Sequence, residues 1–585
     1  MAAAGEQNIS SLPFHVYAEM ACHQKPSAPS RSESCVMSNE SAQNWKAPSR
    51  WLAERALYGL CVWTYSDDLH KGPMGLVFCA SEYDFLEVSL DLPGIRREIA
   101  DWLRRTDRVV VMDSARRQLR HLLAADIDVA RPVCVQTLTR LAGDEPGDER
   151  SPPRDAAAAK RRALEALQAI SPAMDAVASR EQQKVARLES LVLRAFAALE
   201  HRGLAIDEVG WRALVHEAAE KRDRARREVF LALEDVVSRD LFGEPDLSLD
   251  NDADVRAALE KATKMPLPDV AKSTLKELDH PVGKALLGYR EASKIVSTYG
   301  DAFLELLHPE TKRFHATFFP LGASTGRVSS RNPNLQNLPS DERFHRCLRA
   351  PENRALVTAD YATCELRILA EFSADPHFIA AFEQGEDLHS AVASTLFGEK
   401  VSKSENSHLR QAAKAINFGL VYGMGAAALA NSLGRDLDEA EALLAQYFAR
   451  FPRIRGYLED SVDRALSRGY AETALGRRLY FEPATLNGAN ARGELSRIAK
   501  NMPIQGTSAD MTKLAMVRVQ ERLLADFHDA GLVNTIHDEL VVECDADEGD
   551  QVALAVQQEM SEAHRTLIRR VPPEVEVHVG EFWQH

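Results

Sequence analysis

Hydrophobic positions divide the chain into segments with different periods. Between Trp51 and Leu141, short apolar runs such as LYGLCVW and RVVVM alternate with helical patterns such as IRREIADWL, which predicts a small α/β domain. From about residue 181 to 307, apolar residues recur at spacings of three and four, which predicts long amphipathic helices. Strand and helix patterns mix in the remainder, and 585 residues suggest several compact units.

Two segments lack the pattern of a packed core. Residues 1–50 carry only scattered apolar side chains, so we expect a flexible tail. Gly143–Asp155 (GDEPGDERSPPRD) combines glycine, proline and charge, which indicates a linker, and Ala-rich helical sequence follows. We therefore assign residues 51–145 to the α/β domain and residues 146–180 to a linker and a helix.

Composition narrows the possible functions. Hydrophobic residues make up 45% and charged residues 27%, which is typical of a globular protein. The net charge of −16 argues against a polyanionic partner unless basic residues cluster locally. Eight cysteines occur without a CxxC pair, so we expect a reducing cytoplasm rather than a disulfide framework. No apolar run approaches the roughly 18 to 20 residues of a membrane span.

A carboxylate follows a predicted buried strand in RALVTADYATCELRILAEF. Ala355–Ala359 has the pattern of the strand, and Asp360 stands at its C-terminal end, before a helix. Oxygen ligands on a rigid frame suit a hard cation such as Mg²⁺, so Asp360 is a candidate metal ligand. The alternative is an aspartate that caps the helix.

A second acidic group lies in GLVNTIHDELVVECD, where two apolar runs flank His537, Asp538 and Glu539. This pattern predicts a β-hairpin with acidic residues near its tip. Two-metal catalysis needs anionic ligands that converge from separate segments, so Asp538 is a candidate to share a metal with Asp360. The alternative is an ordinary polar turn.

The segment RQAAKAINFGLVYGMG places cations and aromatics on one helical face. Positions i, i+4, i+8 and i+12 fan over about 120° of a helix, and here they are Arg410, Lys414, Phe418 and Tyr422. This order suits a nucleoside triphosphate, with cations at the phosphates and the aromatic end stacked on a base. The alternative is an amphipathic helix with core aromatics and solvated cations.

The stretch from Thr311 to Arg349 reverses the overall sign of the chain, with seven Lys or Arg and two acids. Polar amides are interleaved with the basic residues, which fits contact with a duplex backbone. A solvated basic loop is the alternative.

In this order, these segments resemble the family A DNA polymerases of the bacterial DNA polymerase I type. The resemblance runs from about residue 181 to 585. DYATCELR is similar to motif A, RQAAKAINFGLVYG to motif B and IHDELVVE to motif C. The chain departs from the family pattern at Ala362, Thr363, Cys364 and Gln411, none of which is an implied metal ligand.

The resemblance implies an α+β fold of right-hand shape, with a palm built on an antiparallel sheet. It places a helical thumb at 181–310, palm segments at 311–375 and 496–585, and helical fingers at 376–495. It also implies that Asp360, Asp538 and the Tyr361 carbonyl hold the metals, that Glu539 lies beside them, and that Lys414 donates a proton to pyrophosphate.

The resemblance further implies two sets of binding residues. Residues expected at the incoming nucleotide, with Glu365 as a steric gate against a ribose 2′-hydroxyl, are Arg410, Lys414, Phe418, His389, Glu365, Tyr422 and Tyr361. Residues expected at the primer-template are Lys294, Arg327, Asn334, Gln336, Arg497, Asn501, Gln505 and His537.

The N-terminal α/β region resembles a 3′-5′ exonuclease domain that has lost its metal ligands. Gln118 and Gln136 stand where the resemblance implies two aspartates, and no Asp-x-Glu occurs between Trp51 and Leu141. An amide has no charge to hold a divalent cation, so proofreading is expected to be lost, although Asp113 is a candidate displaced ligand. An unrelated α/β domain is the alternative. About 180 residues before the thumb are too few for an additional 5′ nuclease.

The sequence therefore predicts a template-directed DNA polymerase that binds primer-template DNA and dNTPs. Two Mg²⁺ ions, with Mn²⁺ able to substitute, would serve the reaction. We expect a monomer in the cytoplasm, associated with the nucleoid and not with a membrane. The alternatives are a single-subunit RNA polymerase and a non-catalytic DNA-binding scaffold.

Overall fold

The computed structural model divides into two compact units. Unit 1 consists of Met1–Gly203, Ala316–Arg331 and Leu356–Val579, and unit 2 of Leu204–His315, Asn332–Ala355 and Gly580–His585. The structure describes residues 35–36, 57–65, 68, 70–81, 84–91, 93–105, 109–143, 151–339, 341–421, 423–481 and 489–584. Across these ranges, no helix has both the length and the apolar character that a membrane crossing requires.

A six-stranded mixed sheet forms the N-terminal part of unit 1. Its strands, in the order β1-β4-β3-β2-β5-β6, are Cys35–Val36, Phe85–Ser89, Gly75–Cys79, Leu57–Trp63, Val109–Met112 and Pro132–Cys134. β2, β3 and β4 form an antiparallel meander, while β5 and β6 continue from β2 in parallel. β1 is the part of the predicted tail that the structure describes; the rest of residues 1–50 and residues 144–150 of the predicted linker lie outside the described residues.

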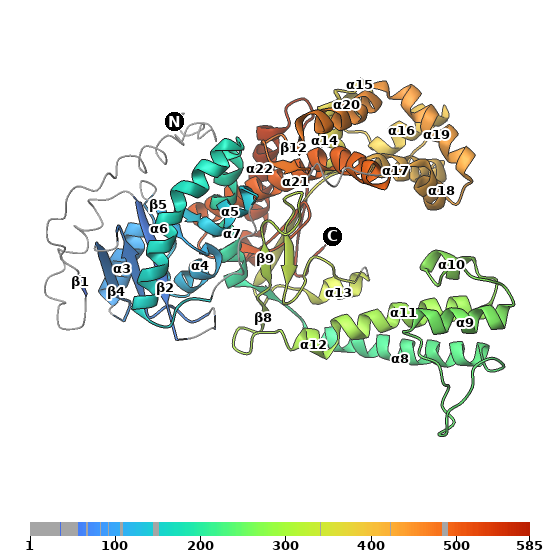
Figure 1. The fold of residues 1–585 in the computed structure, drawn as a ribbon, viewed down its shortest axis with the longest axis horizontal. Helices are drawn as coiled ribbons and strands as arrows, with labels where there is room; N and C mark the ends of the chain where they lie inside the picture. The colour runs from blue at the N-terminus through green and yellow to red at the C-terminus, as the bar shows by residue number, and fades with distance from the viewer. Residues whose placement is uncertain are drawn as a thin grey trace. The chain divides into compact units, whose positions relative to one another are not determined.

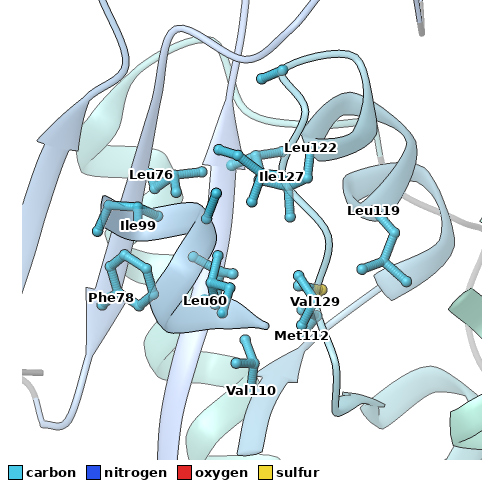
Figure 2. Close-up of a cluster of buried hydrophobic side chains, with 14 of the residues drawn as sticks. Leu60, Leu76, Phe78, Ile99, Val110, Met112, Leu119, Leu122, Ile127 and Val129 are labelled. Carbon is cyan, nitrogen blue, oxygen red and sulfur yellow. The ribbon is translucent and has the colours of Figure 1, made fainter. Parts of the chain in front are cut away.

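One face of this sheet packs on the helices α3 (Pro93–Leu103) and α4 (Ala115–Leu123). Alternate residues of a strand point to opposite faces, and every second residue of β2 and β3 enters this cluster. Figure 2 shows side chains from β2, β3, β5 and both helices in contact, among them Leu60, Phe78 and Ile99. This face is closed by a continuous apolar core.

The opposite face is covered by α6 (Ala156–Ser179), which runs along the sheet in Figure 1. Cys61 and Val77 point to this side and pack against Ala159 and Ala163. A Cβ built on Gly59 of β2 would lie 2.0 Å from the Ala163 carbonyl oxygen, so only glycine allows the helix backbone this close. The helix α5 (Val135–Leu141) completes the domain, and α7 (Gln183–Arg202) packs against it.

The central part of unit 1 is a four-stranded sheet of order β14-β15-β11-β16. Its strands are Gly531–Ile536, Glu539–Asp545, Arg354–Tyr361 and Val575–Gly580. The antiparallel pairing of β14 with β15 confirms the predicted hairpin. The helices α14 (Cys364–Ser373), α21 (Ala489–Asp526) and α22 (Gly549–Leu567) pack around it. The short elements of this part are two pairs of strands and a 3₁₀ turn: β9 (Thr317–Phe319) with β10 (Ser329–Arg331), β12 (Tyr470–Glu472) with β13 (Arg478–Tyr480), and η3 (Ala546–Glu548).

A cluster of helices between α14 and β12 carries the predicted motif B. Its members are α15 (Pro376–Glu383), α16 (Leu388–Phe397), α17 (Ser407–Val421), α18 (Ala426–Leu433), α19 (Leu437–Arg450) and α20 (Pro452–Arg468). Aspartate side chains cap several of these helices, as Asp375 does for α15 and Asp436 for α19, and so satisfy backbone N–H groups that lack a partner.

Unit 2 is built on two long helices, α8 (Glu208–Ala232) and α11 (Pro281–Tyr299), which lie side by side in Figure 1. Trp211 of α8 is buried and stacks on Phe303. The remaining elements are β7 (Leu204–Ala205), α9 (Asp252–Thr263), α10 (Lys272–Glu277), α12 (Asp301–Leu304), β8 (Arg313–Phe314) and α13 (Glu342–Cys347). Unit 2 contains most of the segment that the sequence predicted as the thumb, 181–310. It begins at Leu204, however, so α7, which lies in the predicted thumb, is outside unit 2.

The close approach at Gly59 yields a stability prediction. Gly59→Ala should lower the free energy of unfolding by about 2 kcal/mol, because the new methyl group forces α6 away from β2. Gly94→Ala is the matched control, since a Cβ at Gly94 meets nothing within 4 Å. Thermal unfolding of both variants, followed by circular dichroism, measures the difference. Equal midpoints would show that α6 is not held against β2 at this position.

Candidate active site

Asp360 and Asp538 are carried by neighbouring segments of the four-stranded sheet β14-β15-β11-β16, called the palm sheet here because its strands fall in the predicted palm segments. Asp360 is the penultimate residue of β11, and β15, which follows Asp538, is hydrogen-bonded next to β11. The chain then turns sharply at Thr363, whose φ of 51° lies in the left-handed region, before α14 begins. The predicted strand and the position of the carboxylate at its end are confirmed.

The hairpin tip consists of His537 and Asp538 alone. Ile536 pairs with Glu539, so only two residues connect β14 to β15. His537 has a φ of 52°, a conformation that two-residue hairpin loops require and that histidine adopts more readily than most residues. The tight turn fixes Asp538 relative to the sheet.

Negative charge is concentrated around Asp538. The pKa of Asp538 is raised to about 6, chiefly by burial and also by the carboxylates of Glu365 and Glu539, while a backbone hydrogen bond and Arg327 oppose the shift. Burial also raises the pKa of the Cys364 thiol, and Asp538, Glu365 and Asp360 add to that shift. Groups from β11, α14 and the hairpin therefore lie within electrostatic reach of one another.

This set of oxygen ligands fits a divalent cation. Carboxylates that repel one another in a partly buried place are stabilised by a cation, which lowers their pKa values. The Tyr361 side chain is not available as a ligand, because its hydroxyl is buried and donates to the Met560 carbonyl at 2.7 Å. Only its backbone carbonyl matches the sequence-based expectation for this residue.

Glu365 of α14 is buried and forms an ion pair with Arg327. The sequence predicted that Glu365 contacts the incoming nucleotide and that Arg327 contacts the primer-template DNA. The structure joins them, so the position of one side chain depends on the other.

The motif B helix α17 carries Arg410, Lys414 and Phe418 at intervals of four residues, as predicted. Arg410 donates from Nε and Nη2 to the Asp387 carboxylate, both at 2.8 Å. Asp387 also caps α16 by accepting from the Ser390 N–H, and the Arg410 hydrogen bond holds its pKa well below the usual range. Lys414 is exposed, with Nζ 5.9 Å from the Phe418 ring centroid. Tyr422 lies outside the described residues.

His389 of α16 is almost fully buried beside α17. Its Nδ1 lies 3.2 Å from Asn417 Nδ2, and its ring lies 5.5 Å from that of Phe418. The Tyr447 hydroxyl of α19 donates to Asn417 Oδ1 at 2.9 Å. The pKa of His389 is lowered to about 4, chiefly by burial and also by Arg410 and Lys414, while Asp387 opposes the shift.

The residues predicted to contact DNA fall in both units. Arg497, Asn501 and Gln505 follow one another at intervals of four on α21, and a Cβ at Gly423 would lie 3.1 Å from Arg497 Cγ. Those in unit 1 are Arg327, Arg497, Asn501, Gln505 and His537, and those in unit 2 are Lys294, Asn334 and Gln336.

Gln118 and Asp113 of the N-terminal domain bond to each other. Gln118 donates to Asp113 at 2.6 Å and accepts from the Val62 N–H at 3.0 Å. Asp113 also faces Arg162, at 3.8 Å, and the backbone N–H of Gln136 donates to its carbonyl oxygen. Gln118 thus satisfies a backbone N–H near the end of β2, as expected of a side chain with a structural role.

Comparison with known proteins places this site in a family. Residues 246–585 match the family described as DNA polymerase family A. The chain belongs to that family. The α+β fold class is confirmed by the POL domain of Pol1 from M. smegmatis, solved in complex with DNA primer-template and dNTP. That structure matches this one with a TM-score of 0.79 and 28% identity, covering 91% of this chain and 97% of that one.

The polymerase relatives extend beyond this chain. The thermostable DNA polymerase I of Thermus aquaticus is 37% identical over 399 residues, which cover 66% of this chain and 46% of the relative. DNA polymerase I of Chloroflexus aurantiacus is 40% identical over 320 residues, covering 54% of this chain and 34% of the relative. The match thus spans about half the length of the Thermus protein and about a third of the Chloroflexus protein.

Sequence reasoning missed three residues that hold the predicted ones. Asp387 has a local signal, because an aspartate three residues before Ser390 matches a helix cap. Asn417 and Tyr447 have none, since their contacts join separate helices.

A cluster of buried charged side chains holds α21 against α7. Arg477 and Lys513 both bond to Glu189 of α7, and Arg477 donates to Asp510 at 2.6 Å. Thr473 also donates to Asp510, at 2.7 Å. Burial lowers the pKa of Lys513 to about 8. The cluster connects α7, the β12–β13 hairpin and α21.

Removing the shared anion should destabilise unit 1. Glu189→Gln leaves two buried cations with one carboxylate, so the free energy of unfolding should fall by about 3 kcal/mol. The matched control is Glu181→Gln, because Glu181 is 74% exposed where it pairs with Arg478 and should change stability little. Urea titration followed by fluorescence compares the two. A similar small effect in both variants would contradict a buried ionic cluster.

Proposed function

We propose that the protein is a template-directed DNA polymerase that extends a primer 3′-hydroxyl with dNTPs. The observation that carries the proposal is the approach of Asp360 and Asp538 from adjacent segments of the palm sheet, with a cationic and aromatic helix face elsewhere in the same unit. The family relationship supports the same reaction. Primer-template DNA and dNTPs are its substrates, and the protein acts as a monomer.

In this proposal Asp360, Asp538 and the Tyr361 carbonyl hold two Mg²⁺ ions, for which Mn²⁺ can substitute. When bound, the ions lower the pKa of the primer hydroxyl and stabilise charge on the leaving pyrophosphate. Arg410, Lys414 and His389 bind the triphosphate, and Lys414 donates a proton to pyrophosphate. Phe418 and Tyr422 flank the nascent base pair.

Glu365 selects the sugar in this proposal. Its burial and its ion pair with Arg327 hold the carboxylate in place, which suits a steric gate against a ribose 2′-hydroxyl. Arg327 and the α21 residues Arg497, Asn501 and Gln505 contact the duplex, as does His537. Lys294, Asn334 and Gln336 of unit 2 contact the primer-template. A cytoplasmic location at the nucleoid follows from this substrate.

Primer extension on a recessed DNA duplex with Mg²⁺ tests the reaction. Wild-type protein should extend with dNTPs and not with rNTPs, and Asp538→Asn should reduce the rate by about 10³-fold, since a lost metal ligand removes several kcal/mol of transition-state stabilisation. Asp547→Asn, at an exposed position in η3, is the matched control. Extension with rNTPs would favour an RNA polymerase, and no extension with either would favour a DNA-binding scaffold.

We also propose that the N-terminal sheet domain does not proofread. Gln118 is committed to Asp113 and the β2 backbone, and α6 packs directly against β2 at Gly59, which supports a structural role.

A 5′-labelled primer with a mispaired 3′ end, incubated with Mg²⁺ and no dNTP, tests this. The primer should keep its full length, because the side chains that contact Asp113 among the described residues are Gln118 and Arg162, and neither is a carboxylate that could help to hold a cation. A proofreading polymerase run in parallel shows that the substrate can be trimmed. Shortening that Asp113→Asn abolishes would make Asp113 a working ligand and overturn the proposal.

A further inference from the structure

Three buried side chains form a directed chain of hydrogen bonds that ends at His389. Tyr447 and Asn417 are fully buried, and they belong to α19 and α17, while His389 belongs to α16. The Tyr447 hydroxyl donates to Asn417 Oδ1, and Asn417 Nδ2 faces His389 Nδ1. No sequence pattern indicated this chain of hydrogen bonds, and the proposed reaction does not use Asn417 or Tyr447.

The direction of the chain follows from which group can donate. Burial raises the pKa of Tyr447 well above its usual value, and Asp375 adds to that shift, so the phenol stays protonated and donates. Its proton occupies Asn417 Oδ1 and therefore turns the amide nitrogen toward the histidine. An amide N–H₂ can only donate, so His389 Nδ1 must accept.

An accepting Nδ1 fixes the protonation of the whole ring. In neutral imidazole one nitrogen carries the proton, so here the proton is on Nε2. In the imidazolium form an N–H at Nδ1 would point at the N–H₂ of Asn417, which disfavours the charged form. Among the described residues, no protein atom hydrogen-bonds to Nε2, so this edge of the ring is left as a donor.

Two of the three charged neighbours act in the same direction. Arg410 and Lys414 on α17 both disfavour a positive charge on His389, while Asp387 at the start of α16 favours it and is itself engaged by Arg410. The two cations supply positive charge for a polyphosphate, and a third cation between them would add repulsion. A neutral N–H donor adds a directional hydrogen bond without that repulsion.

We propose that Asn417 and Tyr447 are positioning residues that hold His389 as its neutral Nε2–H tautomer, so that Nε2 donates to a phosphate oxygen of the incoming nucleotide. This inference rests on the proposed function for the identity of the phosphate. The tautomer itself does not depend on it.

The tautomer is measured directly, without activity, in the full-length protein labelled with ¹⁵N-histidine. Long-range ¹H–¹⁵N correlation spectra, with His389 assigned by loss of its signals in His389→Gln, should give the pattern of an acceptor Nδ1 and a protonated Nε2 between pH 6 and 8. Tyr447→Phe should turn this into a mixture, because the amide is no longer held. A wild-type signal from Nδ1–H, or from an imidazolium at pH 7, would overturn the proposal.

Asn417→Asp gives a test with a defined sign. A carboxylate at this position accepts from Nδ1–H, so His389 becomes an imidazolium at low pH and an Nδ1–H tautomer at high pH, with a bare Nε2 toward the phosphate. The dissociation constant of dNTP, from single-turnover incorporation, should then rise roughly tenfold from pH 6 to pH 8.5, the size of one hydrogen bond to a charged group. In wild type it should stay nearly constant.

The double variant Asn417→Asp with His389→Gln is the matched control, because glutamine has no proton to gain or lose. It should lose the added pH dependence, whereas a merely structural effect of Asn417→Asp would persist in it. If Asn417→Asp does not fold, the Tyr447→Phe spectrum decides the proposal, and an unchanged single tautomer there overturns it. Inactivity of every protein with the expected tautomer would contradict the proposed function and leave the positioning role supported.

Discussion

The site depends on holding like charges together in a partly buried place. Asp538 experiences burial and the charges of Glu365 and Glu539, all of which raise its pKa, while a backbone hydrogen bond and Arg327 counteract them. Such an arrangement is unfavourable by itself, so the backbone must impose it. A two-residue hairpin turn fixes Asp538, and β11 in the same sheet fixes Asp360. Strand pairing is therefore the interaction that makes a cation site possible here.

The N-terminal sheet domain is held to α7 and β9 by buried charge. Glu200 of α7 is fully buried and accepts from Arg116 at 2.6 Å and from the Phe318 N–H at 2.7 Å, which joins α4 to β9 through α7. Arg194 of the same helix donates from Nε to Asp128 at 2.8 Å. Removing the domain would leave Glu200 without its cations, at a high cost in stability. The N-terminal sheet domain thus contributes to the stability of unit 1 whether or not it has an activity of its own.

Local pattern predicted the parts of the structure that local physics controls. The run LYGLCVW is β2 residue for residue, because β-branched and aromatic residues favour a buried strand. The hairpin around Asp538 and the helix with Arg410, Lys414 and Phe418 were also predicted from the local pattern of residues. The ion pairs of Arg327 and Arg410 were not, because each joins segments that only the tertiary fold brings together.

The Arg410–Asp387 pair changes how the face of α17 that we propose to bind the triphosphate should be understood. Asp387 uses both carboxylate oxygens, on Arg410 and on the cap of α16, so it is fixed and cannot follow the guanidinium away. Asp387 accepts hydrogen bonds from Nε and Nη2 of Arg410, and among the described residues no hydrogen bond from Arg410 Nη1 occurs. A guanidinium has five N–H donors in a rigid plane, so the pair orients Arg410 and leaves donors for a phosphate. Asp387 holds Arg410 as Asn417 holds His389: in each case a buried or capping side chain fixes the direction of a donor that the sequence alone identified.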